Sequence, residues 1–429
     1  MNSVDVGKLD NLAFTYITDS QSLRKLCESL SAVSAFAMDT EFVRTRTLYP
    51  DLGLIQVFDG HHLALIDPVL IDDLTPFCDL LNNQNITKVL HSCSEDIDAL
   101  HRNLGTVPQP LFDTQFAASL LGKGASIGYA NLVSEMFDIS LDKGESRTDW
   151  IARPLSDSQL SYAAADVTYL LAAYQVLNEQ IQTQGLHECV IQESQQLIHK
   201  KTTLFPAEYA YLLYSNNWKL RGKHLLAFKL LAKWRMELAR EQNVAINFII
   251  KESSMIEIAQ KLPLNISQLH QLHALFGKQI RLYGNTIIAI VEKANAADES
   301  EYPPRVKRLM EFSSYKKAMS DLKAIVDTSA RQHNIPEAVL ASKKQLTQVL
   351  KWCWFSLDEC ALQGIKPDLL SAWRRPLVID ALEQHFDYRD QHANDKHGSN
   401  NQAGHEQAAN NSVSSKQGTQ AKYHALRRL

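Results

Sequence analysis

Residues 35–42 constrain the fold most, because they form a short apolar run that ends in two carboxylates. A run of this length and character predicts a buried β-strand. Side chains alternate between the two faces of a strand, so Asp39 and Glu41 point to the same side of the sheet. Two acids held side by side there repel each other unless a cation lies between them. Asp-x-Glu therefore raises the hypothesis of a metal site, although a solvated strand end explains the triplet alone more simply.

The sequence around this strand alternates strand-like runs with amphipathic helical runs. The pattern predicts further strands at residues 14–18, 54–58, 62–66 and 87–91 and helices at 20–31 and 71–81. Asp59-Gly60 is a hairpin signal, so the strands at 35–42, 54–58 and 62–66 are predicted to be antiparallel neighbours. A mixed sheet covered by helices is the architecture that this pattern favours.

A third acid follows the predicted strand at residues 87–91. A helix begins directly after this strand, and Asp96 falls in its first turns. The neighbours Glu95 and Asp98 are alternative ligands, and all three acids are also typical of a helix N-terminus without any ligand.

A fourth acid lies on a helical pattern that begins at Ser156. Tyr162 and Asp166 are four residues apart on this pattern, so their side chains share one helix face and address one small site. The alternative for Tyr162 is a tyrosine packed under the sheet.

The charge of the chain is divided unevenly between its halves. Residues 1–200 hold 26 Asp+Glu and 12 Lys+Arg, a net of −14, and residues 201–429 hold 22 acids and 32 bases, a net of +10. An acidic half that concentrates cations, joined to a basic half that attracts phosphate, suits a metal-dependent enzyme that acts on nucleic acid. A drift of charge between unrelated domains is the alternative.

Several features indicate the cytoplasm. No apolar run approaches the roughly 18 residues needed to span a membrane, and the start of the chain lacks the basic and apolar regions of a secretory signal. The six cysteines form no Cys-x-x-Cys pair, so we expect reduced packing residues. We expect a cytoplasmic protein that does not bind membranes.

The second half of the chain is predicted to be helical. Residues 218–240 combine many basic residues with an apolar stripe at helical spacing. Acids and two prolines at 294–304 indicate a linker, and the polar composition after about residue 390 indicates disorder. The predicted domains are therefore residues 1–200, 201–296 and 297–389, followed by a tail at 390–429.

Four blocks of sequence carry a resemblance to a known family. They are MDTEFVRTRTLYP at 38–50, LHSCSEDI at 90–97, ESRTDWIARPL at 145–155 and YAAAD at 162–166. The order Asp-x-Glu, Asp, Tyr-x-x-x-Asp resembles the tyrosine-containing branch of the DEDD exonuclease superfamily, and the blocks are similar to those of bacterial ribonuclease D. The segment LLAKWR at 230–235 likewise resembles an HRDC domain, of which ribonuclease D carries two.

This resemblance implies the fold and the roles of the acids. It implies an α/β ribonuclease H-like exonuclease domain, with a mixed sheet flanked by helices, followed by two all-α HRDC-like domains. It also implies two divalent metal ions, Mg²⁺ or Mn²⁺, bridged by Asp39. Glu41 and Asp166 complete the ion on the nucleophile side, Asp96 holds the other ion, and Tyr162 orients the attacking water. A free phenol has a pKa near 10, which argues against Tyr162 as a full base.

Other residues near these blocks are candidates for contact with substrate. Phe42 is predicted to stack on terminal bases, and His91 to touch the substrate, with core packing and a structural histidine as the alternatives. Four arginines pair either with phosphate or with acids of their own domain: Arg44, Arg46, Arg147 and Arg153.

The function expected from the residues and the resemblance is that of a 3′→5′ exoribonuclease. It hydrolyses phosphodiester bonds, releases nucleoside 5′-monophosphates and acts on RNA, with transfer RNA precursors and other small structured RNAs as implied substrates. We expect a monomer. The alternatives are a DNA 3′→5′ exonuclease, which shares the four carboxylates, and a non-catalytic RNA-binding scaffold.

Overall fold

The computed structural model describes residues 6–9, 12–141, 144–145 and 147–386. The described residues form two compact units: the first contains those up to 204 together with 234–252, and the second contains 205–233 together with 253–386. The predicted tail at 390–429 lies outside the described residues. The predicted domain limits stay predictions.

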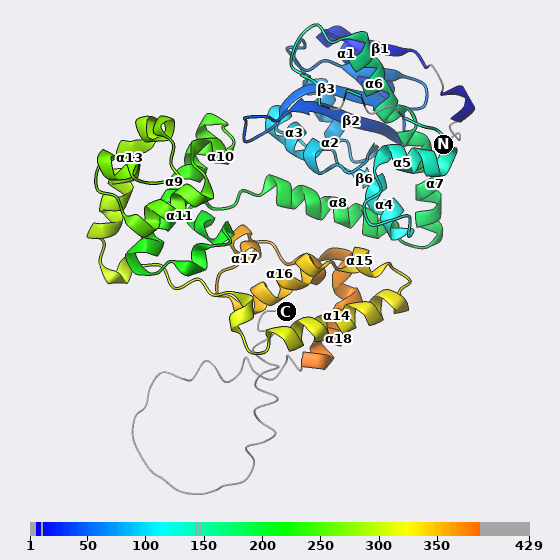
Figure 1. Ribbon diagram of the computed structural model, residues 1–429. Coiled ribbons are helices and arrows are strands. Elements are labelled where there is room, and N and C mark those ends of the chain that lie inside the picture. The colour runs from blue at the N-terminus through cyan, green and yellow to red at the C-terminus, as the bar shows by residue number, and fades with distance from the viewer. Residues whose placement is uncertain (1–5, 10–11, 142–143, 146, 387–429) are drawn as a thin grey trace, which may run out of the picture. The chain divides into compact units, whose positions relative to one another are not determined.

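A six-stranded mixed sheet forms the centre of the first unit (Figure 1). The strands are β1 (Phe14–Ile17), β2 (Ala35–Val43), β3 (Asp51–Phe58), β4 (Leu63–Ile66), β5 (Thr87–Leu90) and β6 (Leu111–Asp113). Their order is β1-β4-β3-β2-β5-β6. The β2–β3 and β3–β4 pairs are antiparallel, as predicted, and the other pairs are parallel. The sequence does not predict β6, because three residues are too few to show an alternating pattern.

Helices cover this sheet. They are α1 (Ser20–Leu30), α2 (Thr75–Asn82), α3 (Ser94–Leu104), α4 (Thr114–Leu120), α5 (Tyr129–Phe137), α6 (Asp157–Thr168), α7 (Leu170–Thr183) and α8 (His187–Thr202). Ser156 caps α6 through a reciprocal capping box with Gln159. The sequence predicts one long helix from Ser156, but the backbone turns at Tyr169 and divides it into α6 and α7.

The two faces of β2 differ in composition, and this difference positions the acids. Phe36 and Met38 point to one face and join a hydrophobic core with side chains of α1, α2 and α3. The other face of β2 carries Ala35, Ala37, Asp39 and Glu41. Helices α6 and α7 contact β2. The small alanines leave room for helices to approach, so the carboxylates lie under α6 rather than in open solvent.

The second unit is helical throughout its described residues. Its elements are η2 (Ala207–Leu213), η3 (Asn217–Lys219), the first half of α9 (Gly222–Gln242), α11 (Glu252–Lys261), α12 (Ile266–His270), α13 (Gly277–Ala296), η4 (Glu299–Glu301), η5 (Leu309–Glu311), α14 (Tyr315–Gln332), α15 (Glu337–Leu340), α16 (Lys343–Trp354), α17 (Glu359–Gln363), η6 (Asp368–Leu370), η7 (Ala372–Arg374) and α18 (Arg375–Phe386). Among the described helices, none combines the length and the apolar character that crossing a membrane requires.

The basic segment predicted at residues 218–240 is only partly exposed. Arg235, on the second half of α9, is 1% exposed. Its guanidinium donates hydrogen bonds to the Ile246 carbonyl at 3.2 Å and to Asn247 Oδ1 at 2.8 Å, at the start of α10 (Ile246–Ile249). This arginine therefore stabilises the corner between α9 and α10.

Candidate active site

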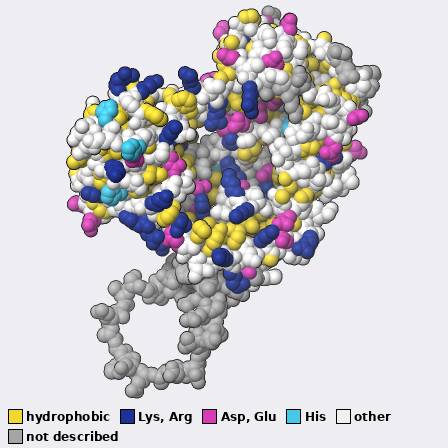
Figure 2. Space-filling model, viewed as in Figure 1, with side chains coloured by type: hydrophobic (Ala, Val, Ile, Leu, Met, Phe, Trp, Pro, Cys, Tyr) yellow, Lys and Arg dark blue, Asp and Glu magenta, His cyan; other side chains and the backbone are white. Residues whose placement is uncertain are grey.

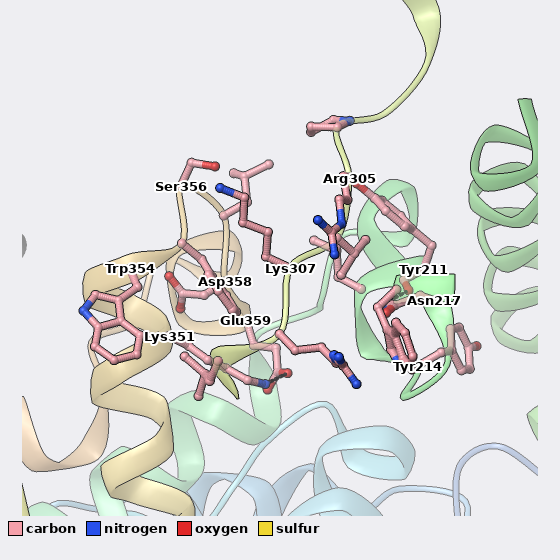
Figure 3. Close-up of a pocket in the computed structure, with 18 of the residues that line it drawn as sticks. Tyr211, Tyr214, Asn217, Arg305, Lys307, Lys351, Trp354, Ser356, Asp358 and Glu359 are labelled. Atoms are coloured by element: carbon pink, nitrogen blue, oxygen red, sulfur yellow. Dashed lines mark hydrogen bonds and ion pairs between the residues drawn. The ribbon is translucent and has the colours of Figure 1, made fainter. Parts of the chain in front are cut away.

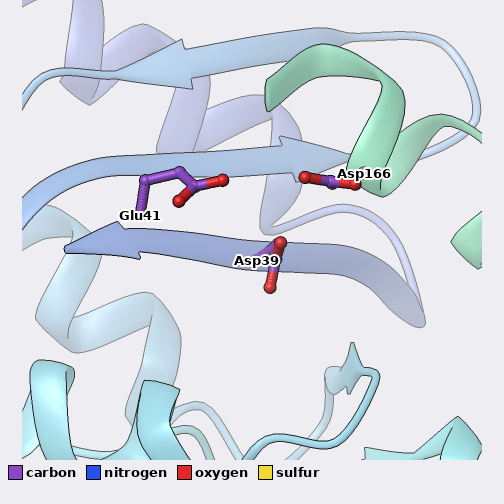
Figure 4. Close-up of side chains that lie close together, drawn as sticks. All are labelled: Asp39, Glu41 and Asp166. Carbon is purple, nitrogen blue, oxygen red and sulfur yellow. The ribbon is translucent and has the colours of Figure 1, made fainter. Parts of the chain in front are cut away.

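Three of the predicted acids converge above the sheet. Asp39 and Glu41 project from β2, and Asp166 reaches toward them from α6 (Figure 4). One carboxylate oxygen from each residue lies within 4.8 Å of the others. Strand alternation and the placement of α6 together produce this cluster, which we call the carboxylate cluster.

Asp96 lies beside the carboxylate cluster without belonging to it. It occupies the first turn of α3 and is 6% exposed. Its Oδ1 accepts a hydrogen bond of 2.5 Å from the hydroxyl of Thr40, the residue between Asp39 and Glu41. Thr40 therefore ties the position of Asp96 to the strand that carries the other two acids.

Asp113 holds the turn that leads into α3. It lies at the end of β6 and accepts hydrogen bonds from the backbone amides of Ser92, at 2.9 Å, and Cys93, at 3.3 Å. Ser92 has a φ of 61°, in the left-handed region that non-glycine residues rarely adopt. The carboxylate thus stabilises the strained turn from which α3 begins and places Asp96. The sequence does not point to Asp113, because this residue ends a strand of three residues that is too short to predict.

Burial raises the pKa of each of these carboxyl groups, and the charges of neighbouring site carboxylates raise it further at Asp39 and Glu41. For Asp39, burial and the charges of Asp96, Asp166 and Glu41 raise the pKa well above its ordinary range. Burial, then the charges of Asp166 and Asp96, raise the pKa of Glu41 to about 9. Burial raises the pKa of Asp166 to about 7 and that of Asp96 to about 6. The four groups cannot all ionise without a compensating positive charge, which favours a bound cation.

Gln56 supplies an independent sign of a polar ligand at this site. It pairs with Asp39 in the β2–β3 ladder, so both side chains point to the same face. Gln56 is fully buried, and neither its amide nitrogen nor its oxygen has a hydrogen-bond partner in the described structure. An unsatisfied buried polar group costs about 1–3 kcal/mol. The orphaned amide and the hard oxygen donors beside it fit a hydrated Mg²⁺ or Mn²⁺ ion.

Tyr162 faces the carboxylate cluster from α6. Its side chain hydrogen-bonds to that of Asp166 and its ring lies 6.3 Å from the ring of the buried Trp150. Burial and the charges of Asp166 and Glu41 raise the pKa of Tyr162 above its ordinary value. The phenol therefore stays protonated at neutral pH and can orient a water molecule, but it cannot serve as a strong base.

The two predicted substrate contacts have different surroundings. Phe42 is partly buried against the core and follows Glu41 at a register shift in the β2–β3 ladder. His91 uses both ring nitrogens, in hydrogen bonds of 2.9 Å with Thr114 Oγ1 and with the Ile127 carbonyl. These bonds give His91 a role in fixing the loop before α5. Contact of either residue with substrate stays a prediction.

Arg153 binds an acid of its own unit. Its Nε lies 2.6 Å from Asp67 Oδ2 and its Nη2 2.7 Å from Oδ1, and Asp67 is fully buried. The guanidinium also donates to the carbonyls of Gly53, at 2.6 Å, and Trp150, at 2.8 Å. A Cβ atom at Gly53 would collide with the Trp150 backbone, so glycine permits this close packing. Of the two alternatives for Arg153, the structure shows the pair within the domain.

The fold and the site define a class of protein. A family model of 3′-5′ exonucleases matches residues 14–182, a model of the HRDC domain matches residues 224–291, and a model of the C-terminal HRDC domain of ribonuclease D matches residues 313–382. The chain is an α/β exonuclease domain followed by two HRDC domains, which confirms the predicted fold class.

Individual relatives narrow the class. Ribonuclease D of Musicola paradisiaca is 41% identical over 370 residues, 86% of this chain and 98% of that protein. The ribonuclease D of Escherichia coli is 40% identical over 369 residues, 86% of this chain and 97% of that protein. The crystal structure of E. coli RNase D, described as an exoribonuclease involved in structured RNA processing, aligns with a TM-score of 0.83 over 88% of this chain and 99% of that chain.

The chain belongs to the ribonuclease D family. It is a 3′→5′ exoribonuclease, as predicted.

Proposed function

We propose that this protein removes nucleoside 5′-monophosphates from the 3′ ends of structured RNAs, including transfer RNA precursors, with two divalent metal ions. The convergence of Asp39, Glu41 and Asp166 within 4.8 Å carries the proposal. Structured RNA is the substrate class described for the E. coli relative. The excess of 32 bases over 22 acids in residues 201–429 supports phosphate binding by the HRDC domains.

The carboxylates divide the metal ligands among them in this proposal. Asp39 would be shared by both ions, Glu41 and Asp166 would hold the ion on the nucleophile side, and Asp96 would hold the other. Bound divalent ions supply Lewis acidity, which neutralises charge on the phosphate and makes a water molecule a stronger nucleophile. The water oxygen adds to phosphorus, the bond from phosphorus to the 3′ oxygen breaks, and that oxygen takes up a proton. Tyr162 orients the water through its hydroxyl.

Tyr162→Phe tests this orienting role. The substitution removes one hydroxyl, and we expect kcat to fall about 100-fold, a typical size for the loss of a positioned proton-handling group. Mn²⁺ affinity, measured by calorimetry, should stay within about twofold, since the four carboxylates remain. Tyr174→Phe, on α7 and packed against Phe112, is the matched control. An unchanged kcat would remove Tyr162 from the mechanism.

Metal affinity should rise with pH. Metal ligation requires ionised carboxylates, and the raised pKa values of Asp166 (about 7) and Glu41 (about 9) mean that the metal-free site holds protons at neutral pH. These groups stabilise the metal-free fold at low pH, and that contribution is lost as pH rises through their native pKa values. Thermal melts between pH 6 and pH 9 should therefore show an increasing shift on adding Mg²⁺. A shift independent of pH would contradict the assignment.

Phe42 is proposed to stack on the base at the 3′ end of the RNA. Phe42→Leu keeps an apolar side chain against the core but removes the ring face on which a base can stack. We expect KM for RNA to rise about fivefold, at the low end of base–aromatic stacking energies, with unchanged Mg²⁺ affinity. An unchanged KM would leave Phe42 as a packing residue.

Product and substrate assays test the proposed function as a whole. Calorimetric titration should show two Mn²⁺ ions per chain, and chromatography should show nucleoside 5′-monophosphates released from a transfer RNA precursor with an unpaired 3′ end. Direct competition between 3′-tailed RNA and DNA of one sequence should favour RNA. Equal use of DNA, one metal ion per chain, or release of nucleoside 3′-monophosphates would each contradict part of the proposal.

A further inference from the structure

A cavity of about 600 Å³ lies within the second unit, and no member of the carboxylate cluster lines it. Three segments form its walls (Figure 3): the η2–η3 segment with Tyr211, the chain before η5 with Lys307, and the end of α16 with Trp354. Ligand pockets in proteins typically enclose about 300–1,000 Å³, so the cavity has the size of a binding site for a small group.

Basic side chains outnumber acidic ones in the wall of this cavity. Its acids already have structural partners: Asp358 caps α17 through the amides of Cys360 and Ala361, and Glu359 lies 2.9 Å from Lys351. The lining includes the bases Arg305, Lys307, Arg308 and Lys351 and the acids Asp358 and Glu359.

The basic side chains in the segment before η5 differ in whether a carboxylate pairs with them. Glu311 pairs with Arg305 at 2.6 Å and with Arg308 at 3.2 Å. Lys307 is exposed and lies 6.0 Å from the centre of the Phe312 ring, and among the described residues no carboxylate forms an ion pair with it. The cavity therefore presents uncompensated positive charge, which attracts an anion such as a phosphate.

Aromatic rings and an arginine plane, on which an RNA base could stack, lie beside these basic side chains. The guanidinium carbon of Arg308 lies 3.8 Å from the centre of the Trp218 ring. Trp354 stacks on Phe312 with ring centres 4.9 Å apart and an angle of 24° between the planes. Unpaired RNA bases stack on aromatic rings and on arginine planes. Figure 2 shows hydrophobic and basic side chains next to each other over α16 and α17.

We propose that this cavity binds one unpaired nucleotide of a structured RNA substrate. The base stacks beside the Arg308–Trp218 pair, and the phosphate lies near Lys307. A cavity of about 600 Å³ is in the size range of pockets that hold one small ligand, and an unpaired nucleotide is free to enter it because its base is not held in a duplex. The inference rests on the proposed RNA substrate. It adds to the active site a second contact with RNA, which does not depend on the carboxylate cluster.

Charge reversal at Lys307 tests the phosphate contact. The probe is a hairpin RNA with an unpaired 3′ tail, and its affinity is measured by fluorescence anisotropy over a range of salt. We expect Lys307→Glu to weaken binding about tenfold and to lower the salt slope by about one. Lys344→Glu, an exposed change of equal charge in the first turn of α16 and outside the cavity, is the control. Equal affinities of the two variants would overturn the proposal.

Two further measurements separate this proposal from the proposed function. Hydrolysis of a short unstructured RNA with Mg²⁺ should be equal in wild type and Lys307→Glu, whereas a failure of the wild type to hydrolyse it would refute the proposed function itself. Full-length Asp39→Asn protein should form photo-crosslinks between the 4-thiouridine tail of the hairpin and segments 211–218 or 305–309. Crosslinks only outside the segments that line the cavity would overturn the proposal even if Lys307→Glu weakened binding.

Discussion

Asp39→Asn should lower the rate of RNA hydrolysis at least about 1,000-fold at saturating Mg²⁺, the scale of losing a charge that acts on the transition state. Asparagine has the shape of aspartate but cannot supply the negative charge that the proposed shared ligand needs. The affinity for RNA should change less than about twofold, because in the proposed function phosphate contacts by the basic domains supply most of it. Single-turnover hydrolysis and anisotropy with the same RNA measure the two quantities.

The melting temperature of Asp39→Asn, with and without Mg²⁺, distinguishes loss of a metal ligand from misfolding of the variant. The charges of Asp96, Asp166 and Glu41 repel that of Asp39, so the metal-free variant should melt at a higher temperature than wild type at pH 8. Mg²⁺ should raise its melting temperature less than that of wild type. Asp79→Asn, an exposed change on α2, is the control and should leave both quantities unchanged. Near-normal hydrolysis by Asp39→Asn would refute the metal assignment.

Arg153→Met should destabilise the exonuclease domain by about 3–5 kcal/mol, as is typical when one partner of a buried ion pair is removed. The fully buried Asp67 would lose its bidentate partner, and the Gly53 carbonyl would lose its donor. Burial alone would raise the pKa of Asp67, but the hydrogen bonds and charge of Arg153 lower it overall. The pair's contribution is therefore present at neutral pH and is lost as pH falls through the native pKa. Urea unfolding with hydrogen exchange of β3 and β4 measures the loss.

Two comparisons make this second prediction specific. Arg24→Met removes an exposed pair with Asp73, in which the side chains are 60% and 40% exposed, and should cost at most about 1 kcal/mol. The double change Asp67→Asn with Arg153→Met should be less destabilising than the sum of the single changes, because no buried charge is left alone. A loss below about 1 kcal/mol for Arg153→Met would show that the pair does not hold this region together.

Local sequence patterns were sufficient to predict which site side chains share a face of a strand or helix. Strand alternation puts Asp39 and Glu41 on one face, and helical spacing puts Tyr162 beside Asp166. Neither pattern depends on how distant parts of the chain pack, so both could be derived from the residues alone. The convergence of Asp166 on β2 is a tertiary contact, and it entered the predictions only through the resemblance to ribonuclease D.

The residues that hold the site in place could not be predicted in this way. Gln56 lies opposite Asp39 only because the β2–β3 register places it there. Asp113 acts across 21 residues on Ser92, and Arg153 acts across 86 residues on Asp67. Each of these contacts depends on register or on long-range packing, and no local periodicity encodes either. For Arg153 the structure shows the ion pair with an acid of its own domain, which was the alternative to phosphate binding.

The most direct test of the account uses one hairpin RNA with an unpaired 3′ tail, labelled at either end and incubated with the full-length protein. With Mg²⁺, the 3′ label should appear only in a mononucleotide, while the 5′ label should appear in products that shorten progressively. EDTA should prevent the formation of both labelled products, and Asp39→Asn should form neither of them. Release of the 5′ label as a mononucleotide, internal fragments, or undiminished degradation in EDTA would contradict a metal-dependent 3′→5′ exoribonuclease built on the carboxylates of β2 and α6.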